Sequence, residues 1–184
     1  DDPVVSETFK NVPVQLVNTE VLTEAGLTYE VLDNTTVVES ITIYGPRTLV
    51  ESLKENDIIA KADLNDITVA NTVAINVSVD ARNSSKITNI RSSLDCVKLN
   101  IEESKSKQLV INAQTNGKLA SGYIVGGIEL DQNRIRISGP ESVVSKIATA
   151  KVNADVTEAN SDVATYGTVR LYDKDGVEIE SELL

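Results

Sequence analysis

Apolar and polar residues alternate along much of the chain, and one alternating stretch occurs twice. Residues 41–50 run from an alternating segment through Gly45-Pro46 into a short amphipathic segment, and residues 135–144 repeat this order through Gly139-Pro140. Alternation with period two predicts a strand. Proline fits the first position of a helix, because the N–H of that position has no partner within the helix. Gly139 lies 94 residues after Gly45, about the length of a small domain, so the pattern predicts a duplicated module.

In the first copy we expect residues 1–8 to be an extended lead-in that precedes the first strand. Pro13 places that strand at a sheet edge or close to a strand start, because proline cannot donate to a ladder. After Gly45-Pro46, an apolar stripe at Leu49, Val50 and Leu53 predicts a short helix. The alternating and apolar segments of this copy predict strands at 11–17, 27–32, 37–44, 58–62, 72–80 and 97–101.

The charged and small residues 102–107 predict the boundary, which gives modules at residues 1–103 and 104–184. The second copy then repeats the order of the first. It has a strand at 109–111, a Tyr123-Ile124-Val125 segment that matches Tyr29-Glu30-Val31, a helical stripe at Val143, Val144 and Ile147, and an alternating run at 168–172. Asp175-Gly176 predicts a hairpin turn. No segment after residue 180 repeats the strand expected at 97–101.

Each copy therefore holds several short strands and one short helix after its Gly-Pro. The apolar residues are mostly Val, Ile and Leu, with few aromatic residues. This pattern predicts a mainly β, β-rich α+β fold made of two tandem modules with aliphatic cores.

The charge balance excludes one class of partner. The chain has 17 basic and 28 acidic residues, a net charge of −11, and no basic run. A nucleic-acid surface needs Lys and Arg gathered in a patch, so we expect no nucleic-acid partner. The chain has no Met, so Asp1 is not a retained initiator and we expect a processed or excised part of a longer protein. No apolar run approaches the roughly 20 residues that span a bilayer.

The residues needed for common catalytic and metal sites are missing. The chain has no His, which excludes His-dependent triads and the usual zinc sites. Gly126-Gly127 lacks the Lys-Ser/Thr of a phosphate-binding loop. The stretch that starts at Asp173 has Val177 and Leu184 where a calcium loop needs oxygen ligands. We therefore predict no catalytic, cofactor-binding or metal-binding residue.

Two carboxylates and one thiol need an interpretation. Asp63 and Asp155 recur at equivalent places, each after a predicted strand. Because they lie in separate modules, we expect each to cap the following loop rather than to form an acid–base pair. The single cysteine, Cys96, lies in a strand-like run, and we expect a buried, inert thiol.

The doubled motif resembles the YbbR-like domain. Its parts are an apolar strand, Gly-Pro, a short apolar segment and, about 15 residues later, Ala-Asp. The residues that follow Asp2-Pro3 resemble the segment after the membrane helix of these proteins, and the resemblance covers residues 8–101 and 106–180. The structural residues that carry the motif are Gly45, Pro46, Asp63, Gly139, Pro140 and Asp155.

This resemblance implies a function, but no interaction residues. YbbR-like proteins typically have one N-terminal membrane helix, which this sequence does not contain, and several tandem domains outside the membrane. In Firmicutes, CdaR-type members regulate the CdaA-type membrane-bound diadenylate cyclase, which makes cyclic di-AMP. The resemblance thus implies non-catalytic, extracytoplasmic modules without a cofactor, which could offer strand edges to a partner. The alternatives are a structural or adhesive cell-surface repeat protein, and an enzyme using Asp and Glu.

Overall fold

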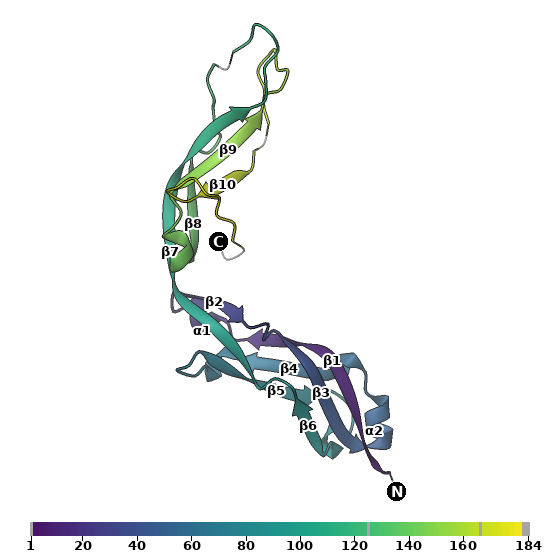
Figure 1. Cartoon of the computed structure of the whole chain (residues 1–184). Helices are drawn as coiled ribbons and strands as arrows, with labels where there is room; N and C mark the ends of the chain where they lie inside the picture. The colour runs from purple at the N-terminus through teal and green to yellow at the C-terminus, as the bar shows by residue number, and fades with distance from the viewer. Residues whose placement is uncertain (1, 125, 166, 182–184) are drawn as a thin grey trace. The chain divides into compact units, whose positions relative to one another are not determined.

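The computed structural model describes residues 2–124, 126–165 and 167–181 (Figure 1). The chain divides into two compact units, Asp1–Ile101 (unit 1) and Glu102–Leu184 (unit 2). The division lies two residues before the predicted boundary. Both units consist mainly of strands, so the predicted β-rich α+β class is confirmed.

The first strand of unit 1, β1 (Val4–Val17), has two partners. Its residues 4–13 pair antiparallel with β3 (Val37–Pro46), and its residues 14–17 pair parallel with β4 (Ile58–Asp63). Pro13, which has no N–H to donate, is the last residue of the β3 ladder. The expectation that Pro13 lies at a sheet edge or strand start is therefore wrong: it lies inside β1, where the pairing changes.

The expected lead-in is also largely part of β1. Residues 4–8 face residues 42–46, with Val5 opposite Gly45. Polar residues in this stretch obscure the alternation of apolar and polar positions. Residues 4–8 nevertheless form a strand because they pair with β3.

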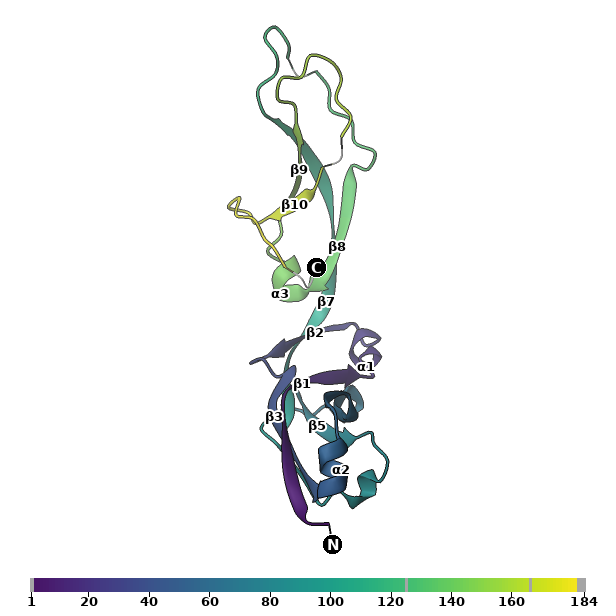
Figure 2. The same ribbon diagram turned by 90° about the vertical axis from the view of Figure 1, so that its right-hand side faces the viewer.

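The rest of unit 1 surrounds these three strands. Its helices are α1 (Glu20–Thr23) and α2 (Arg47–Ser52), with short 3-10 turns at Glu55–Asp57, Leu64–Asp66 and Ser84–Lys86. Its other strands are β2 (Leu27–Leu32), β5 (Thr72–Val79), β6 (Asn89–Ser92) and the beginning of β7 (Cys96–Asn116). β3 pairs with β6, β4 with β5, and β7 with both β5 and β2. The predicted helix after Gly45-Pro46 is confirmed as α2, which packs beside β1 and β3 (Figure 2).

Unit 2 repeats the central part of this topology. From residue 104, β7 pairs antiparallel with β8 (Arg134–Pro140) and, from residue 111, parallel with β9 (Thr149–Asp155). β9 pairs antiparallel with β10 (Val169–Tyr172), and α3 (Glu141–Val144) follows the second Gly-Pro. A bridge between Tyr172 and Glu178 closes the predicted hairpin. The order and directions match those of β1, β3, β4 and β5, which agrees with the predicted duplication.

Three details differ from the sequence expectation. Residues 102–107 are not a linker but part of β7, because their backbone continues the ladder to β8. Pro46 and Pro140 end their strands, and each helix begins one residue later, at Arg47 and Glu141. Tyr123 and Ile124 lie in no strand, unlike Tyr29 in β2, and Val125 lies outside the described residues.

Each unit has its own core cluster at the corresponding place. In unit 1 it contains Phe9, Val12, Val38, Ile41, Ile43, Leu49, Leu53, Ile58 and Ala60. In unit 2, Ile137, Val144 and Ile147 are buried among Leu109, Ile135, Val143, Leu171 and Ile179. Ile137 and Ile147 take the places of Ile43 and Leu53, each 94 residues later. The part of the chain that the structure describes contains no helix long and apolar enough to cross a membrane.

Candidate interaction surface

A carboxylate from the start of each unit accepts hydrogen bonds from the first turn of the helix that follows the Gly-Pro. In unit 1, the Thr48 N–H donates to the Asp2 carboxylate at 3.2 and 3.3 Å, and the Arg47 N–H donates to the Pro3 carbonyl at 2.9 Å. In unit 2, the Ser142 N–H and hydroxyl donate to the two carboxylate oxygens of Glu102 at 3.0 and 2.9 Å. The first N–H groups of a helix have no partner within it, so these carboxylates satisfy donors that would otherwise need water.

The glycine of the motif brings two backbone segments together. A Cβ atom at Gly45 would lie 3.4 Å from a methyl carbon of Val50 and 3.5 Å from the Cα atom of Ile87. This position therefore sits under α2 and against the segment after the turn at 84–86. This contact gives Gly45 a structural role, whereas the roles of Pro46, Gly139 and Pro140 stay predictions.

Asp63 and Asp155 each hold the turn that follows their strand. The Asp63 carboxylate accepts from the Asn18 side chain and from the Asn65 N–H, both at 2.9 Å. The Asp155 carboxylate accepts from the Thr157 hydroxyl at 2.6 Å and from the Thr157 N–H at 2.9 Å. These bonds lower the pKa of both groups, chiefly through the Asn18 side chain at Asp63 and the Thr157 hydroxyl at Asp155. Each carboxylate thus has the geometry of a cap within its own unit.

Cys96 was expected to be buried, and this is wrong: it is only half-buried, opposite Ala74 of β5 at the beginning of β7. A thiol where a strand has just begun is covered on one side only. Across residues 2–124, 126–165 and 167–181, no group of three or more Cys, Asp or Glu residues could hold a metal ion.

A concave surface lies in unit 2. It is a hollow of about 740 Å³ between the ends of β7 and β9 and the loops after each of them, and residues such as Gln114, Asn153, Ala154 and Val156 line it. The ionisable side chains among its described lining residues are all acidic, namely Glu129, Asp131 and Asp162. Large apolar side chains are exposed in the same loops: Tyr123 by 53%, Ile124 by 90%, Ile128 by 45% and Val163 by 49%.

The corresponding place in unit 1 is a closed core. There, Leu22, Ala62, Leu64, Val73, Val97 and Leu99 form a second buried cluster. The strand registers show which residues of the two units correspond. Val17 of β1 pairs with Asp63 of β4, and Asn116 of β7 pairs with Asp155 of β9. Ala154 and Val156 therefore take the places of Ala62 and Leu64, but they are only half-buried and line the hollow.

Sequence reasoning missed this hollow. It identified the expected strand at 97–101 as a segment without a counterpart in the second copy. It did not connect that difference with the residues that the strand covers.

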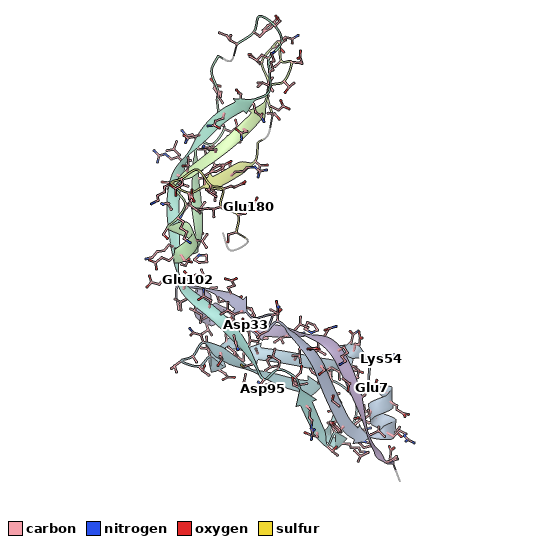
Figure 3. All side chains as sticks on the ribbon, viewed as in Figure 1. Glu7, Asp33, Lys54, Asp95, Glu102 and Glu180 are labelled. Carbon is pink, nitrogen blue, oxygen red and sulfur yellow. The ribbon has the colours of Figure 1, made fainter. Side chains whose placement is uncertain are left out.

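Charged side chains lie along the strands and turns of both units, as Glu7 and Glu102 illustrate on strands and Asp33 and Asp95 beside them (Figure 3). Ion pairs on this surface are exposed: Lys98 lies 3.6 Å from Asp33, and Arg170 lies 2.9 Å from Glu178. Exposed pairs of this kind contribute little to stability. The charged side chains therefore form a solvated surface. The loops around the hollow differ from it because they expose large apolar side chains.

Comparison with known proteins gives one family. The family model described as "YbbR-like protein" matches residues 12–101 and 109–183. Among solved structures, the chain is similar to the crystal structure of a YbbR-like protein from Streptococcus pneumoniae TIGR4, with 14% identity and a TM-score of 0.49. That alignment covers 97% of this chain and 89% of the other. No significant match was found among curated proteins.

Proposed function

The chain belongs to the YbbR-like protein family, and on this premise we propose that it is a non-catalytic interaction module of a membrane-anchored, CdaR-type regulator. Its partner is a CdaA-type membrane-bound diadenylate cyclase, whose output of cyclic di-AMP the full-length protein modulates. The observation that carries this proposal is the match of the family to both halves of the chain, residues 12–101 and 109–183.

The surface chemistry supports a protein partner over a nucleic acid. The net charge of −11 would repel phosphates. Contiguous exposed apolar residues, by contrast, mark protein contacts on many soluble domains. Ile124 and Tyr123 provide such a group beside the hollow of unit 2. The module would therefore act by binding another polypeptide.

The same proposal places the module on the extracytoplasmic face of the membrane. A hydrophobic helix of about 20 residues, N-terminal to Asp1 in the longer protein, would provide the anchor. Reading the natural sequence upstream of Asp1 is the simplest check. An apolar segment of that length supports the anchor, and a polar upstream sequence with no such segment contradicts it.

Co-purification tests the partner. The full-length protein, solubilised from membranes, is expected to bring down the diadenylate cyclase, and its deletion is expected to change the cellular level of cyclic di-AMP. Returning the full-length gene should restore that level, whereas a gene lacking residues 1–184 should not. Reproducible failure to co-purify, together with an unchanged nucleotide level after deletion, would sink the proposal and favour a structural or adhesive surface protein.

A further inference from the structure

We propose that the outer face of the unit 2 sheet binds a short acidic segment of a partner polypeptide. Four basic residues from three strands, which we call the basic face, carry this inference: Arg134 and Arg136 of β8, Lys151 of β9 and Arg170 of β10. The inference rests on strand register and charge, and it does not depend on the identity of the cyclase.

Strand register places the four basic side chains on one side of the sheet. The strands lie side by side in the order β8, β7, β9 and β10 (Figure 1), and residues that pair directly share a face. Arg136 and Arg134 pair with positions 108 and 110 of β7, position 112 pairs with Lys151, and Lys151 pairs with Arg170. Positions 108, 110 and 112 all point away from the core, because successive side chains of a strand alternate between its faces.

Two side-chain contacts agree with this placement. The Arg136 guanidinium donates to the Ser106 hydroxyl of β7 at 2.9 Å. The Lys151 ammonium lies 5.0 Å from the centre of the Tyr172 ring, on the neighbouring strand. Neither Arg134 nor Arg136 has an acidic ion-pair partner among the described residues. The sheet thus gathers basic side chains that the sequence spreads over 37 positions, from 134 to 170.

The fold itself does not require these charges, because unit 1 lacks them. β8 follows β3 by 94 residues, as Gly139 follows Gly45, and β9 and β10 follow β4 and β5 by 92, as Asp155 follows Asp63. Unit 1 has uncharged residues at all four corresponding positions, namely Ser40, Thr42, Ile59 and Ser78. The basic face is therefore a property of unit 2 and not of the duplicated architecture.

One pair within the basic face is unfavourable for the sheet. Lys151 and Arg170 lie directly opposite each other on neighbouring strands, and like charges at such positions destabilise a sheet. An ion pair with Glu178, 2.9 Å from Arg170, offsets part of this repulsion, but exposed pairs of this kind contribute little. Because folding gains nothing from the repulsion, this arrangement fits a ligand that neutralises the charges.

Spacing and surroundings indicate which anion fits. Arg134 and Arg136 are two residues apart on one strand, about 7 Å, and carboxylates at every second residue of an extended peptide have the same spacing. Arginine binds carboxylates through two parallel hydrogen bonds. A short peptide would contact the basic face alone. A membrane or a long phosphate polymer would also meet the acidic remainder of a chain whose net charge is −11, so the polypeptide is favoured.

A peptide titration on the full 184-residue chain tests the basic face. The probe is a fluorescent peptide in which four glutamates alternate with threonines, and its control has glutamine in place of each glutamate. We expect the control to bind at least about tenfold more weakly, which corresponds to roughly 1.4 kcal/mol, and the probe to weaken as salt is added. NMR signals of the amides at 108–112, 134–136 and 151 should shift, with those at 40–44 of unit 1 unchanged.

A double variant tests the arginines. Arg134→Ser with Arg136→Thr gives unit 2 the residues that unit 1 has at these places, and it should bind the probe at least about tenfold more weakly. Lys118→Ser with Lys146→Thr is the matched control, because it removes the same charge from two exposed lysines outside the basic face. This control should bind within about twofold of the original chain, since distant exposed charges are screened.

A second double variant separates binding from folding. Lys151→Ile with Arg170→Ser introduces the pair that unit 1 has at these positions, Ile59 and Ser78. It should also weaken binding, while unit 2 unfolds at no lower urea concentration because the repulsion is removed. If both double variants of the basic face unfold unit 2, the charges serve the fold and the proposal fails.

Other results would also overturn the proposal. These are equal binding of the glutamine control, an equal loss with the Lys118 and Lys146 variant, signal changes that map to unit 1, or no binding at millimolar peptide. Tighter binding to vesicles of phosphatidylglycerol and phosphatidylcholine, or to polyphosphate, than to the glutamate probe would replace the polypeptide with a phosphate-bearing partner.

Discussion

Ser142 donates two hydrogen bonds to Glu102, from its N–H at 3.0 Å and from its hydroxyl at 2.9 Å. A similar relationship joins Thr48 to Asp2 in unit 1, where the Thr48 N–H alone donates to both carboxylate oxygens and the acceptor is one methylene shorter. Because β7 pairs with β8 in the register of β1 with β3, Glu102 comes 100 residues after Asp2 and meets the helix that follows the second Gly-Pro. The beginning of each unit is thereby tied to its helix.

Glu102→Ala should destabilise the start of α3. The variant leaves the Ser142 N–H without its acceptor, and loss of a helix cap costs about 1 kcal/mol. Hydrogen exchange of the amides at 139–144 measures the local effect. Glu103→Ala is the matched control, since Glu103 has an exposed ion pair with Lys105 and should change these amides by less than about 0.5 kcal/mol. Equal effects of both variants would contradict the cap.

Gly117→Ala should disturb the turn at Asp155 more than Gly122→Ala disturbs its own turn. Both glycines have positive φ, 91° and 87°, so an alanine is strained at either one. A Cβ at Gly117 would also collide with the Thr157 hydroxyl and lie 2.8 Å from the Asp155 carboxylate, whereas nothing lies within 4 Å at Gly122.

The difference between these two alanine variants therefore isolates the collision. We expect Gly122→Ala to cost about 1 kcal/mol and Gly117→Ala a further 1–3 kcal/mol. Urea unfolding followed by NMR signals of unit 2 measures both. Equal costs would show that the turn at Asp155 accommodates the added Cβ without a further loss of stability.

The pKa of Asp155 should rise when Thr157→Val removes the hydroxyl. That hydroxyl is the main cause of the lowered pKa, and the Thr157 N–H remains as a weaker one. A carboxyl with a lowered folded pKa contributes stability above its unfolded pKa of about 3.9, and this stability is lost as the pH falls through the folded pKa. In the variant this loss should therefore begin at a higher pH.

NMR titration of the aspartate side-chain carbons between pH 2 and 6 measures this shift. Asp63 in unit 1 is the internal control, because its pKa is lowered mainly by the Asn18 side chain. It should titrate identically in both proteins. An unchanged Asp155 midpoint would show that the hydroxyl does not favour the ionised form.

Leu99→Ala should open the second core cluster of unit 1. Leu99 is 4% exposed, and truncating a buried leucine costs about 2–5 kcal/mol. The neighbouring Lys98→Ala removes only an exposed ion pair with Asp33 and should cost less than about 1 kcal/mol. Urea unfolding followed by unit 1 signals distinguishes them. Similar, small losses would mean that residues 96–101 are not needed to close this core.

The sequence predicts the repeating elements well, because a strand–Gly-Pro–helix pattern is local. The alternation before Gly45 and the stripe at Leu49 and Val50 specify β3 and α2 without any long-range information. What depends on distant partners was missed. Residues 4–8 and 102–107 look like a lead-in and a linker because their polar residues obscure the alternation, and only the ladders to β3 and β8 make them strands.

The candidate surface escaped prediction for a related reason. The hollow lies between loops that follow β7 and β9, and no local pattern shows that these two distant segments lie side by side. Tyr123-Ile124 has the composition of the strand it resembles, Tyr29-Glu30 in β2, yet it forms none. In unit 1, that strand pairs with β7, so whether such a segment forms a strand depends on packing against distant residues as well as on local propensity.

The change of partners within β1 has a consequence for biosynthesis. β1 leaves the ribosome before either β3 or β4 exists, and its parallel half finds its partner only when Asp63 has emerged. At about 5–20 residues per second, that wait lasts a few seconds. Nascent chains therefore carry an unsatisfied strand during this interval, and slowed translation between residues 17 and 63 should lengthen its exposure to chaperones.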